Sequence, residues 1–155
     1  MKYYIETITR NYFYFDGRAR RREYWWFVLF DTIVMLLLTV ADHYFGWIIP
    51  LEDSSGKIMR VVEISTTVYI FATAFPRIAI TTRRLHDIGK SGWLQLILII
   101  VPPIGWALLV IFCGLFQLLA FTPFVGWMIL VVMCAQDGQR WDNQYGPNPK
   151  RRHRY

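Results

Sequence analysis

The sequence predicts an all-α membrane protein with four transmembrane helices and a short amino-terminal interfacial helix. Of the 155 residues, 55% are hydrophobic and 17% are aromatic. The apolar residues fall in long blocks rather than in the short periodic stripes that form a soluble core. The basic residues gather at the ends of these blocks. We therefore treat residues 1–155 as a single membrane domain.

The first two apolar blocks, residues 24–45 and 61–82, are each long enough for one helix across the bilayer. About 20 apolar residues cover the roughly 30 Å hydrocarbon core. The first block begins too far into the chain to be a removable signal peptide and lacks a small-residue cleavage site. We expect two retained spans. The charges that interrupt them are Asp31 and Asp42 in the first and Glu63 and Arg77 in the second.

The third apolar block, Ser91–Gln136, contains no charged residue. A single helix of that length would be about twice as long as the bilayer core is thick. We therefore predict two spans, residues 93–113 and 115–135, with a turn near Gly114. The alternative is a break at Pro102–Pro103, with the residues before it forming a half-span that re-enters from the same side.

The distribution of basic residues predicts the orientation. Only Lys57 and Arg60, of the 17 lysines and arginines, lie in the loop between the first two spans. Lysine and arginine beside spans are mostly retained in the cytoplasm. Four spans therefore place both ends, residues 1–23 and 136–155, in the cytoplasm, whereas three would carry the basic tail across the membrane. Because this topology explains the pI near 9.5, no nucleic-acid partner is expected.

The amino-terminal segment has apolar residues at roughly helical spacing, with polar residues among them. This pattern predicts a helix over residues 2–15 that lies flat at the membrane interface. Gly17 would end this piece and allow the turn into the first span. The apolar residues are Ile5, Ile8, Tyr12 and Phe15.

Three motifs carry a resemblance to a known family. They are GRARRREYWWF at Gly17–Phe27, RRLHDIGKSGW at Arg83–Trp93 and NQYGPNP at Asn143–Pro149. In this order they resemble the domain of unknown function 805 family over nearly the whole chain. The resemblance implies a small, multi-pass protein of a bacterial inner membrane with no assigned biochemical activity. One departure is that PPIGW at 102–106 is followed by PFVGW at 123–127, which resembles a local duplication or insertion.

The predicted topology brings the three motifs to one cytoplasmic face. We expect a basic platform with aromatic edges at headgroup depth, able to bind anionic lipid headgroups or an acidic partner. The alternative is ordinary anchoring with internal salt bridges, for example from Asp87 or Glu23 to a neighbouring arginine. The platform residues are Arg18, Arg20, Arg21, Arg22, Trp25, Arg83, Arg84, His86, Asp87, Lys90, Trp93 and Tyr145.

Asp31 and Arg77 are predicted to pair within the membrane. With the first two spans antiparallel, they lie about 10 Å and about 9 Å from the same surface. Pairing removes the cost of placing each charge alone in lipid. Pro76 lacks an amide hydrogen, so the Ala72 carbonyl is left as a local acceptor. The alternative is that Arg77 extends to the surface while Asp31 is protonated or bonded to a nearby threonine or tyrosine.

The adjacent His86 and Asp87 raise the question of catalysis. Neighbouring residues on a helix do not face each other, and no nucleophile or metal-ligand spacing accompanies them, so we predict no enzyme, metal site or cofactor. The sequence instead predicts a non-catalytic interaction or membrane-organising component. Its expected partners are membrane lipids, a membrane protein or a second copy. Transport of a small substrate or ion by an oligomer is the alternative, with Asp31 and Glu63 as candidate residues.

Overall fold

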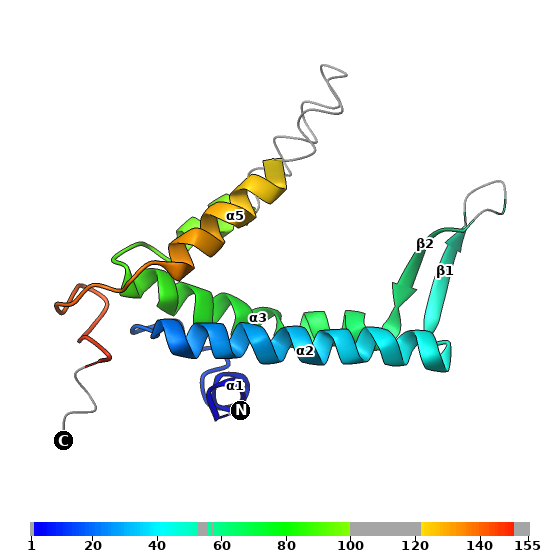
Figure 1. The fold of residues 1–155 in the computed structure, drawn as a ribbon, viewed down its shortest axis with the longest axis horizontal. Coiled ribbons are helices and arrows are strands. Elements are labelled where there is room, and N and C mark those ends of the chain that lie inside the picture. The colour runs from blue at the N-terminus through cyan, green and yellow to red at the C-terminus, as the bar shows by residue number, and fades with distance from the viewer. Residues whose placement is uncertain (1, 53–55, 57, 100–121, 151–155) are drawn as a thin grey trace, which may run out of the picture. The chain divides into compact units, whose positions relative to one another are not determined.

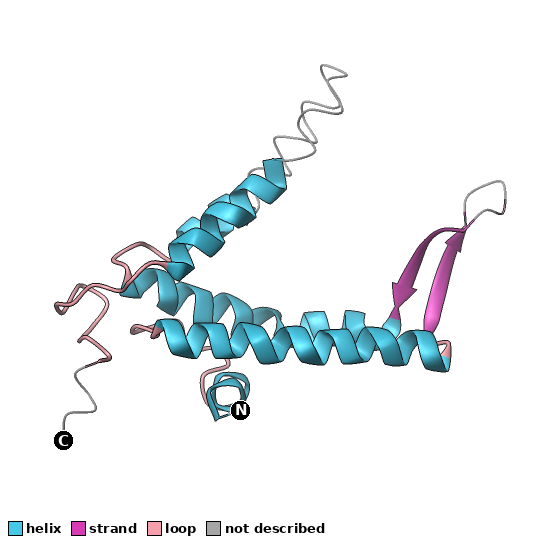
Figure 2. Ribbon diagram, viewed as in Figure 1, coloured by secondary structure: helices cyan, strands magenta, loops and turns pink. Residues whose placement is uncertain are grey.

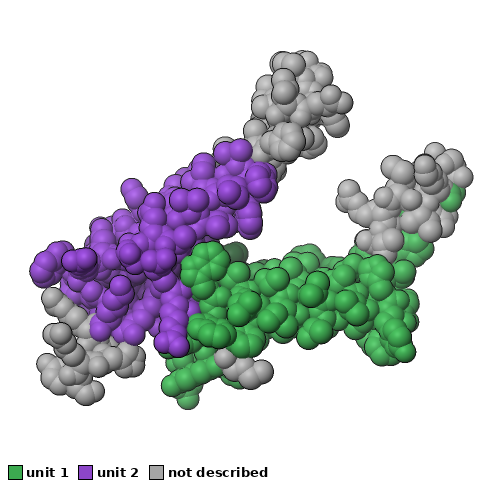
Figure 3. Space-filling model, in the orientation of Figure 1, with its two compact units in different colours: residues 1–13, 25–78 green, residues 14–24, 79–155 purple. Residues whose placement is uncertain are grey.

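The computed structural model describes residues 2–52, 56, 58–99 and 122–150, and the described part is mostly helical (Figure 1). The chain forms two compact units, shown in Figure 3. Unit 1 contains residues 1–13 and 25–78, and unit 2 contains residues 14–24 and 79–155. The elements are α1 (Lys2–Thr9), α2 (Arg21–Phe45), β1 (Ile48–Glu52), β2 (Ile58–Glu63), α3 (Ile64–Asp87) and α5 (Thr122–Ala135).

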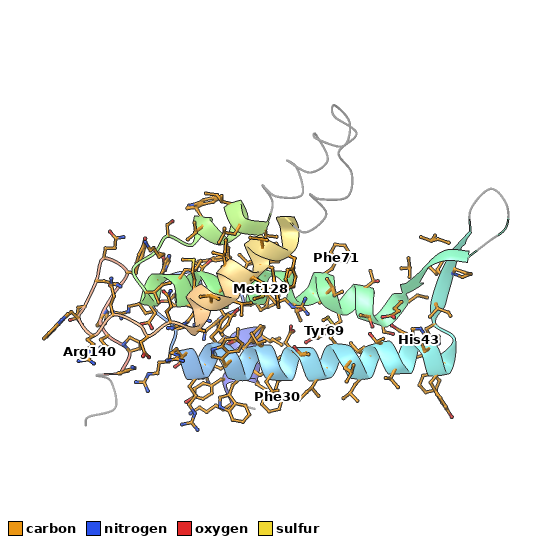
Figure 4. The ribbon with its side chains drawn as sticks, turned by 45° about the horizontal axis from the view of Figure 1, so that its top comes forward. Phe30, His43, Tyr69, Phe71, Met128 and Arg140 are labelled. Atoms are coloured by element: carbon orange, nitrogen blue, oxygen red, sulfur yellow. The ribbon has the colours of Figure 1, made fainter. Side chains whose placement is uncertain are left out.

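Within the described residues, α2 and α3 are the helices that are long and apolar enough to cross a membrane. Their apolar side chains are mostly exposed, as lipid-facing side chains should be. Leu36 of α2 is 65% exposed, and Phe71 of α3 is 74% exposed. Phe71 is labelled in Figure 4. α2 begins three residues before the predicted span and ends where predicted, at Phe45. Gly46, with a φ of 69°, follows it in the left-handed conformation that ends many helices.

A β-hairpin joins the two long helices, which the all-α prediction did not include. β1 and β2 pair antiparallel, with Ile48 opposite Glu63 (Figure 2). α3 therefore starts at Ile64 rather than at residue 61. The physical reason is a cap from α2, because the buried Asp42 carboxylate accepts hydrogen bonds from the N–H groups of Ser65, at 3.1 Å, and Thr66, at 2.9 Å. These are first-turn N–H groups with no partner inside the helix.

α1 is shorter than predicted. It ends at Thr9, before the predicted end at Phe15, where the Asn11 N–H donates to the Glu6 carbonyl five residues earlier, one residue beyond the helical pattern. Gly17 has a φ of 81°, so the predicted turn is present there even though the helix has already ended.

Aromatic side chains hold α1 within unit 1. The Tyr4 ring lies 5.7 Å from the Phe27 ring and 6.1 Å from the Phe30 ring, measured between centroids. Its hydroxyl oxygen lies 2.7 Å from that of Tyr69 on α3. The amino-terminal segment is therefore part of the packed unit.

The predicted third and fourth spans are described only in part. Residues 93–99 are helical, and α5 ends at Ala135, where the fourth span was predicted to end. The turn near Gly114 and the alternative break at Pro102–Pro103 lie outside the described residues. The four-span count therefore stays a prediction.

Candidate functional site

The three motifs meet in unit 2 around one buried carboxylate. Asp87, in the last turn of α3, accepts a hydrogen bond at Oδ1 from Arg18 Nε at 2.9 Å. Its other oxygen accepts one from Arg84 Nη1, one helical turn earlier. The three side chains are only 1%, 6% and 0% exposed for Arg18, Asp87 and Arg84. We call these three residues the Arg18–Asp87–Arg84 cluster.

Arg84 also caps the carboxyl end of α5. Its Nε donates to the Cys134 carbonyl at 2.9 Å, and its Nη2 donates to the Gln136 carbonyl. Carbonyls at this end of a helix have no partner within the helix, and the helix dipole favours a positive charge there. The arginine therefore joins the end of α3 to the end of α5.

Arg18 binds the tail that follows α5. Its Nη1 donates to the Trp141 carbonyl at 2.8 Å, and its Nη2 donates to the Gln139 carbonyl. The next residue continues the connection, because the Ala19 N–H donates to the Arg83 carbonyl at 3.0 Å. One side chain and its neighbour thus hold the first motif, α3 and the tail together.

Two glycines allow the tail to approach the cluster. A Cβ on Gly138 would overlap the Asp87 carboxylate, and a Cβ on Gly89 would overlap the Gln139 side chain. Gly89 also has a φ of 76° and ends α3. The Gln139 N–H donates to the Asp87 carbonyl at 2.8 Å. Nothing in the spacing of the motifs distinguished Gly138, whose role depends on what faces it.

His86 and Tyr145, both predicted site residues, stack with their rings 3.8 Å apart at an interplanar angle of 1°. His86 Nδ1 lies 3.2 Å from the Gly17 carbonyl oxygen. Since a carbonyl only accepts, this nitrogen carries the proton. Asn143 of the third motif donates to the His86 carbonyl at 2.9 Å. His86 therefore connects all three motifs.

The remaining predicted platform residues divide between interior and surface. The Arg83 guanidinium is buried, 6.0 Å from the centroid of the Tyr14 ring. Arg20 donates to the Pro149 carbonyl. Arg22, Trp25, Lys90 and Trp93 are exposed.

Arg21 forms a surface ion pair of 2.7 Å with Asp137, a partner that the sequence analysis did not identify. The hydrogen bond and the positive charge of Arg21 lower the pKa of Asp137. The two side chains are 46% and 77% exposed, so the pair contributes little to stability. The predicted platform thus divides into a buried, internally bonded cluster and a set of exposed basic and aromatic residues.

The predicted pair of Asp31 and Arg77 is present in unit 1. Arg77 Nε lies 2.9 Å from Asp31 Oδ2. The other carboxylate oxygen accepts a hydrogen bond from the Tyr69 hydroxyl at 2.8 Å, so Tyr69 reaches from α3 to α2 (Figure 4). Because Tyr69 donates to Asp31, its oxygen accepts from Tyr4. The Asp31 carboxylate thus pairs with the predicted arginine, Arg77, and also accepts a hydrogen bond from a tyrosine, Tyr69, as in the alternative hypothesis.

Glu63, the second acidic residue considered for transport, lies at the end of β2. It accepts a hydrogen bond from the Thr39 hydroxyl at 2.9 Å, and His43 Nδ1 lies 3.7 Å from its other oxygen.

Over residues 2–52, 56, 58–99 and 122–150, no three His, Cys, Asp or Glu side chains gather as a possible metal site.

Comparison with known proteins identifies the family. Residues 12–117 match the family described as "Protein of unknown function (DUF805)". The chain is 34% identical over 150 residues to the inner membrane protein YhaH of Escherichia coli strain K12, covering 97% of this chain and 98% of YhaH. It is 37% identical over 114 residues to the inner membrane protein YhaI of the same strain, covering 73% of this chain and 84% of YhaI. No solved structure matches. The resemblance carried by the three motifs is confirmed, and the chain is an inner-membrane protein that belongs to the DUF805 family.

Proposed function

We propose that this protein is a non-catalytic, membrane-organising component that binds anionic lipid headgroups through the exposed rim of unit 2. The observation that carries the proposal is that the polar residues of the three motifs and the tail divide into a buried set and an exposed set. The buried ones hold the three motifs to one another, and the others are exposed at the surface. We define the exposed rim as Arg22, Lys90, Trp93, Arg140, Trp141 and Lys150.

The buried cluster supports a structural role for the two residues that raised the question of catalysis. A general base must reach the proton that it removes. The Asp87 side chain is 6% exposed and binds two arginines. His86 stacks on Tyr145, and its Nδ1 faces the Gly17 carbonyl. The groups that could activate a nucleophile are thus already bonded within the fold.

The composition of the rim supports a lipid partner. Trp93 and Trp141 are each 74% exposed. Arg140, labelled in Figure 4, directly precedes Trp141 in the tail. Tryptophan prefers the headgroup region, and each basic residue near a negatively charged leaflet contributes about 1 kcal/mol. With four spans and both termini in the cytoplasm, the rim would face the cytoplasmic leaflet.

Native mass spectrometry of the protein extracted from mixed membranes tests the proposal. We expect more bound phosphatidylglycerol than phosphatidylethanolamine, and a loss of this preference in the triple variant Arg22→Gln, Lys90→Gln, Arg140→Gln. The matched control is Arg22→Lys, Lys90→Arg, Arg140→Lys, which changes the same three exposed residues but keeps their charges, and it should leave the preference intact. Equal binding of both lipids, or an unchanged preference in the triple variant, would refute it.

Transport by an oligomer is the second candidate, and the bonded network around Asp31 favours it. Acidic side chains within spans often mark ion or substrate pathways. Two tyrosine hydroxyls lead from α1 to the buried Asp31 carboxylate. Proton-coupled flux into proteoliposomes that disappears with Asp31→Asn would support this candidate. No flux above empty vesicles would leave the network with a structural role.

A further inference from the structure

The connection between α2 and the hairpin carries a group of exposed aromatic and aliphatic side chains. Consecutive rings contact each other, with centroids 5.1 Å apart for Tyr44 and Phe45 and 5.2 Å apart for Phe45 and Trp47. Side chains two residues apart along a strand lie on the same face, so Trp47 shares one face of the hairpin with Ile49 and Leu51 of β1. We call the group the aromatic corner: Tyr44, Phe45, Trp47, Ile49 and Leu51, which are 83%, 60%, 53%, 50% and 46% exposed.

The backbone at this corner is hydrogen-bonded within the protein. The Trp47 N–H donates to the Asp42 carbonyl at 2.8 Å, and the Ile64 N–H donates to the Trp47 carbonyl at 3.1 Å. The Asp42 carboxylate meanwhile caps α3. Irregular chain is excluded from a bilayer mainly because its backbone N–H and C=O groups lack hydrogen-bond partners there. At this corner the protein supplies those partners, so the corner can lie at a depth where water is scarce.

The length of α2 sets the depth of the corner. A helix from Arg21 to Phe45 has 25 residues and rises about 37 Å, which exceeds the roughly 30 Å hydrocarbon core. With the arginines that begin α2 in one headgroup layer, Phe45 reaches the other. Aromatic residues concentrate at that depth. In Figure 1 the hairpin turns away from the axes of α2 and α3, so its strands leave the corner across the helix direction.

We propose that the aromatic corner inserts into the headgroup layer at the end of α2 opposite Arg21, and that its partner is the lipid surface itself. The rings anchor α2 at this depth, and Ile49 and Leu51 hold the start of the hairpin against the membrane. This anchor is separate from the basic rim of unit 2 and depends on α2 crossing the bilayer. It holds whether or not the rim selects anionic lipid.

Fluorescence quenching of Trp47 tests the proposal with a conservative change. The emission of the full chain minus that of Trp47→Phe, both in phosphatidylethanolamine and phosphatidylglycerol vesicles, reports on Trp47. We expect lipids brominated near the headgroup to remove most of this difference emission, and dissolved iodide to remove little. Efficient quenching by iodide with none by brominated lipid would place the corner in water and overturn the proposal.

A second measurement distinguishes lipid from a protein partner. Single nitroxide labels at positions 45 and 49, in a chain with Cys113→Ala and Cys134→Ala, are compared with labels at the exposed Leu37 of α2 and the exposed Gln144 of the tail. Accessibility to oxygen and to a water-soluble nickel chelate should be intermediate between these references. Labels shielded from both reagents would show that protein covers the corner, and labels as accessible to the chelate as position 144 would show that water does. Either result would refute a lipid anchor.

Discussion

The Tyr12 hydroxyl donates a hydrogen bond to the Ala72 carbonyl oxygen, at an oxygen–oxygen distance of 2.6 Å. Ala72 lies four residues before Pro76 in α3. Proline has no amide hydrogen, so this carbonyl lacks its helical donor. The sequence predicted the unpaired carbonyl, and the structure supplies its partner from the segment that follows α1. The amino-terminal segment thereby compensates for a hydrogen bond that α3 cannot make.

Tyr12→Phe should destabilise the protein by about 0.5 to 1.5 kcal/mol, because it keeps the ring and removes the hydrogen bond to the Ala72 carbonyl. Pro76→Ala restores a helical donor to Ala72. Tyr12→Phe should therefore cost clearly less in the Pro76→Ala background than in the native one. Denaturant unfolding in detergent measures both costs. Equal costs in the two backgrounds would mean that the hydrogen bond does not compensate for the donor missing at Pro76.

The pair of Asp31 and Arg77 should show energetic coupling. Asp31→Asn and Arg77→Gln should each destabilise the detergent-solubilised protein, because each leaves a charge without its partner 2.9 Å away. The double variant should lose much less than the sum of the two. A strictly additive double variant would show that the two side chains do not stabilise each other.

Asp87→Asn should be among the most damaging substitutions in unit 2. It leaves the buried guanidiniums of Arg18 and Arg84 facing an uncharged amide, and breaking a buried ion pair costs about 3 to 5 kcal/mol. The matched control is Asp137→Asn, which removes the exposed pair with Arg21 and should cost less than about 1 kcal/mol. Thermal unfolding in detergent compares them. Similar losses for the two would argue that the cluster is not a structural centre.

Gly138→Ala should destabilise unit 2 by steric conflict alone, since its added Cβ would overlap the Asp87 carboxylate. The effect should depend on that carboxylate. In an Asp87→Ala background, where the overlapping atoms are gone, the same substitution should cost little. Protease protection of the tail in detergent reports the docking. A loss of protection that is the same in both backgrounds would assign the effect to the backbone rather than to the overlap.

Features that depend on local quantities could be predicted from the sequence. Hydrophobic length located α2 and the helical core of α3, because a helix that crosses lipid needs a set number of apolar residues. The helical rise placed Asp31 and Arg77 at matching depths, and the structure pairs them. The motifs identified the family. The hairpin was not predicted. The residue that caps the start of α3, and so separates α3 from β2, is Asp42, which lies more than 20 residues away in sequence.

By itself, the sequence determined where the long helices run, which two charges pair between them and which residues gather near the site. Only the tertiary structure decided how those residues are used. Arg83 and Arg84 are adjacent and chemically identical, yet one stacks near Tyr14 and the other binds Asp87 and caps α5. The physical reason is that the ligands of Arg84 are mostly backbone carbonyls, such as that of Cys134. Every residue has one, and only the fold decides which of them point at a guanidinium.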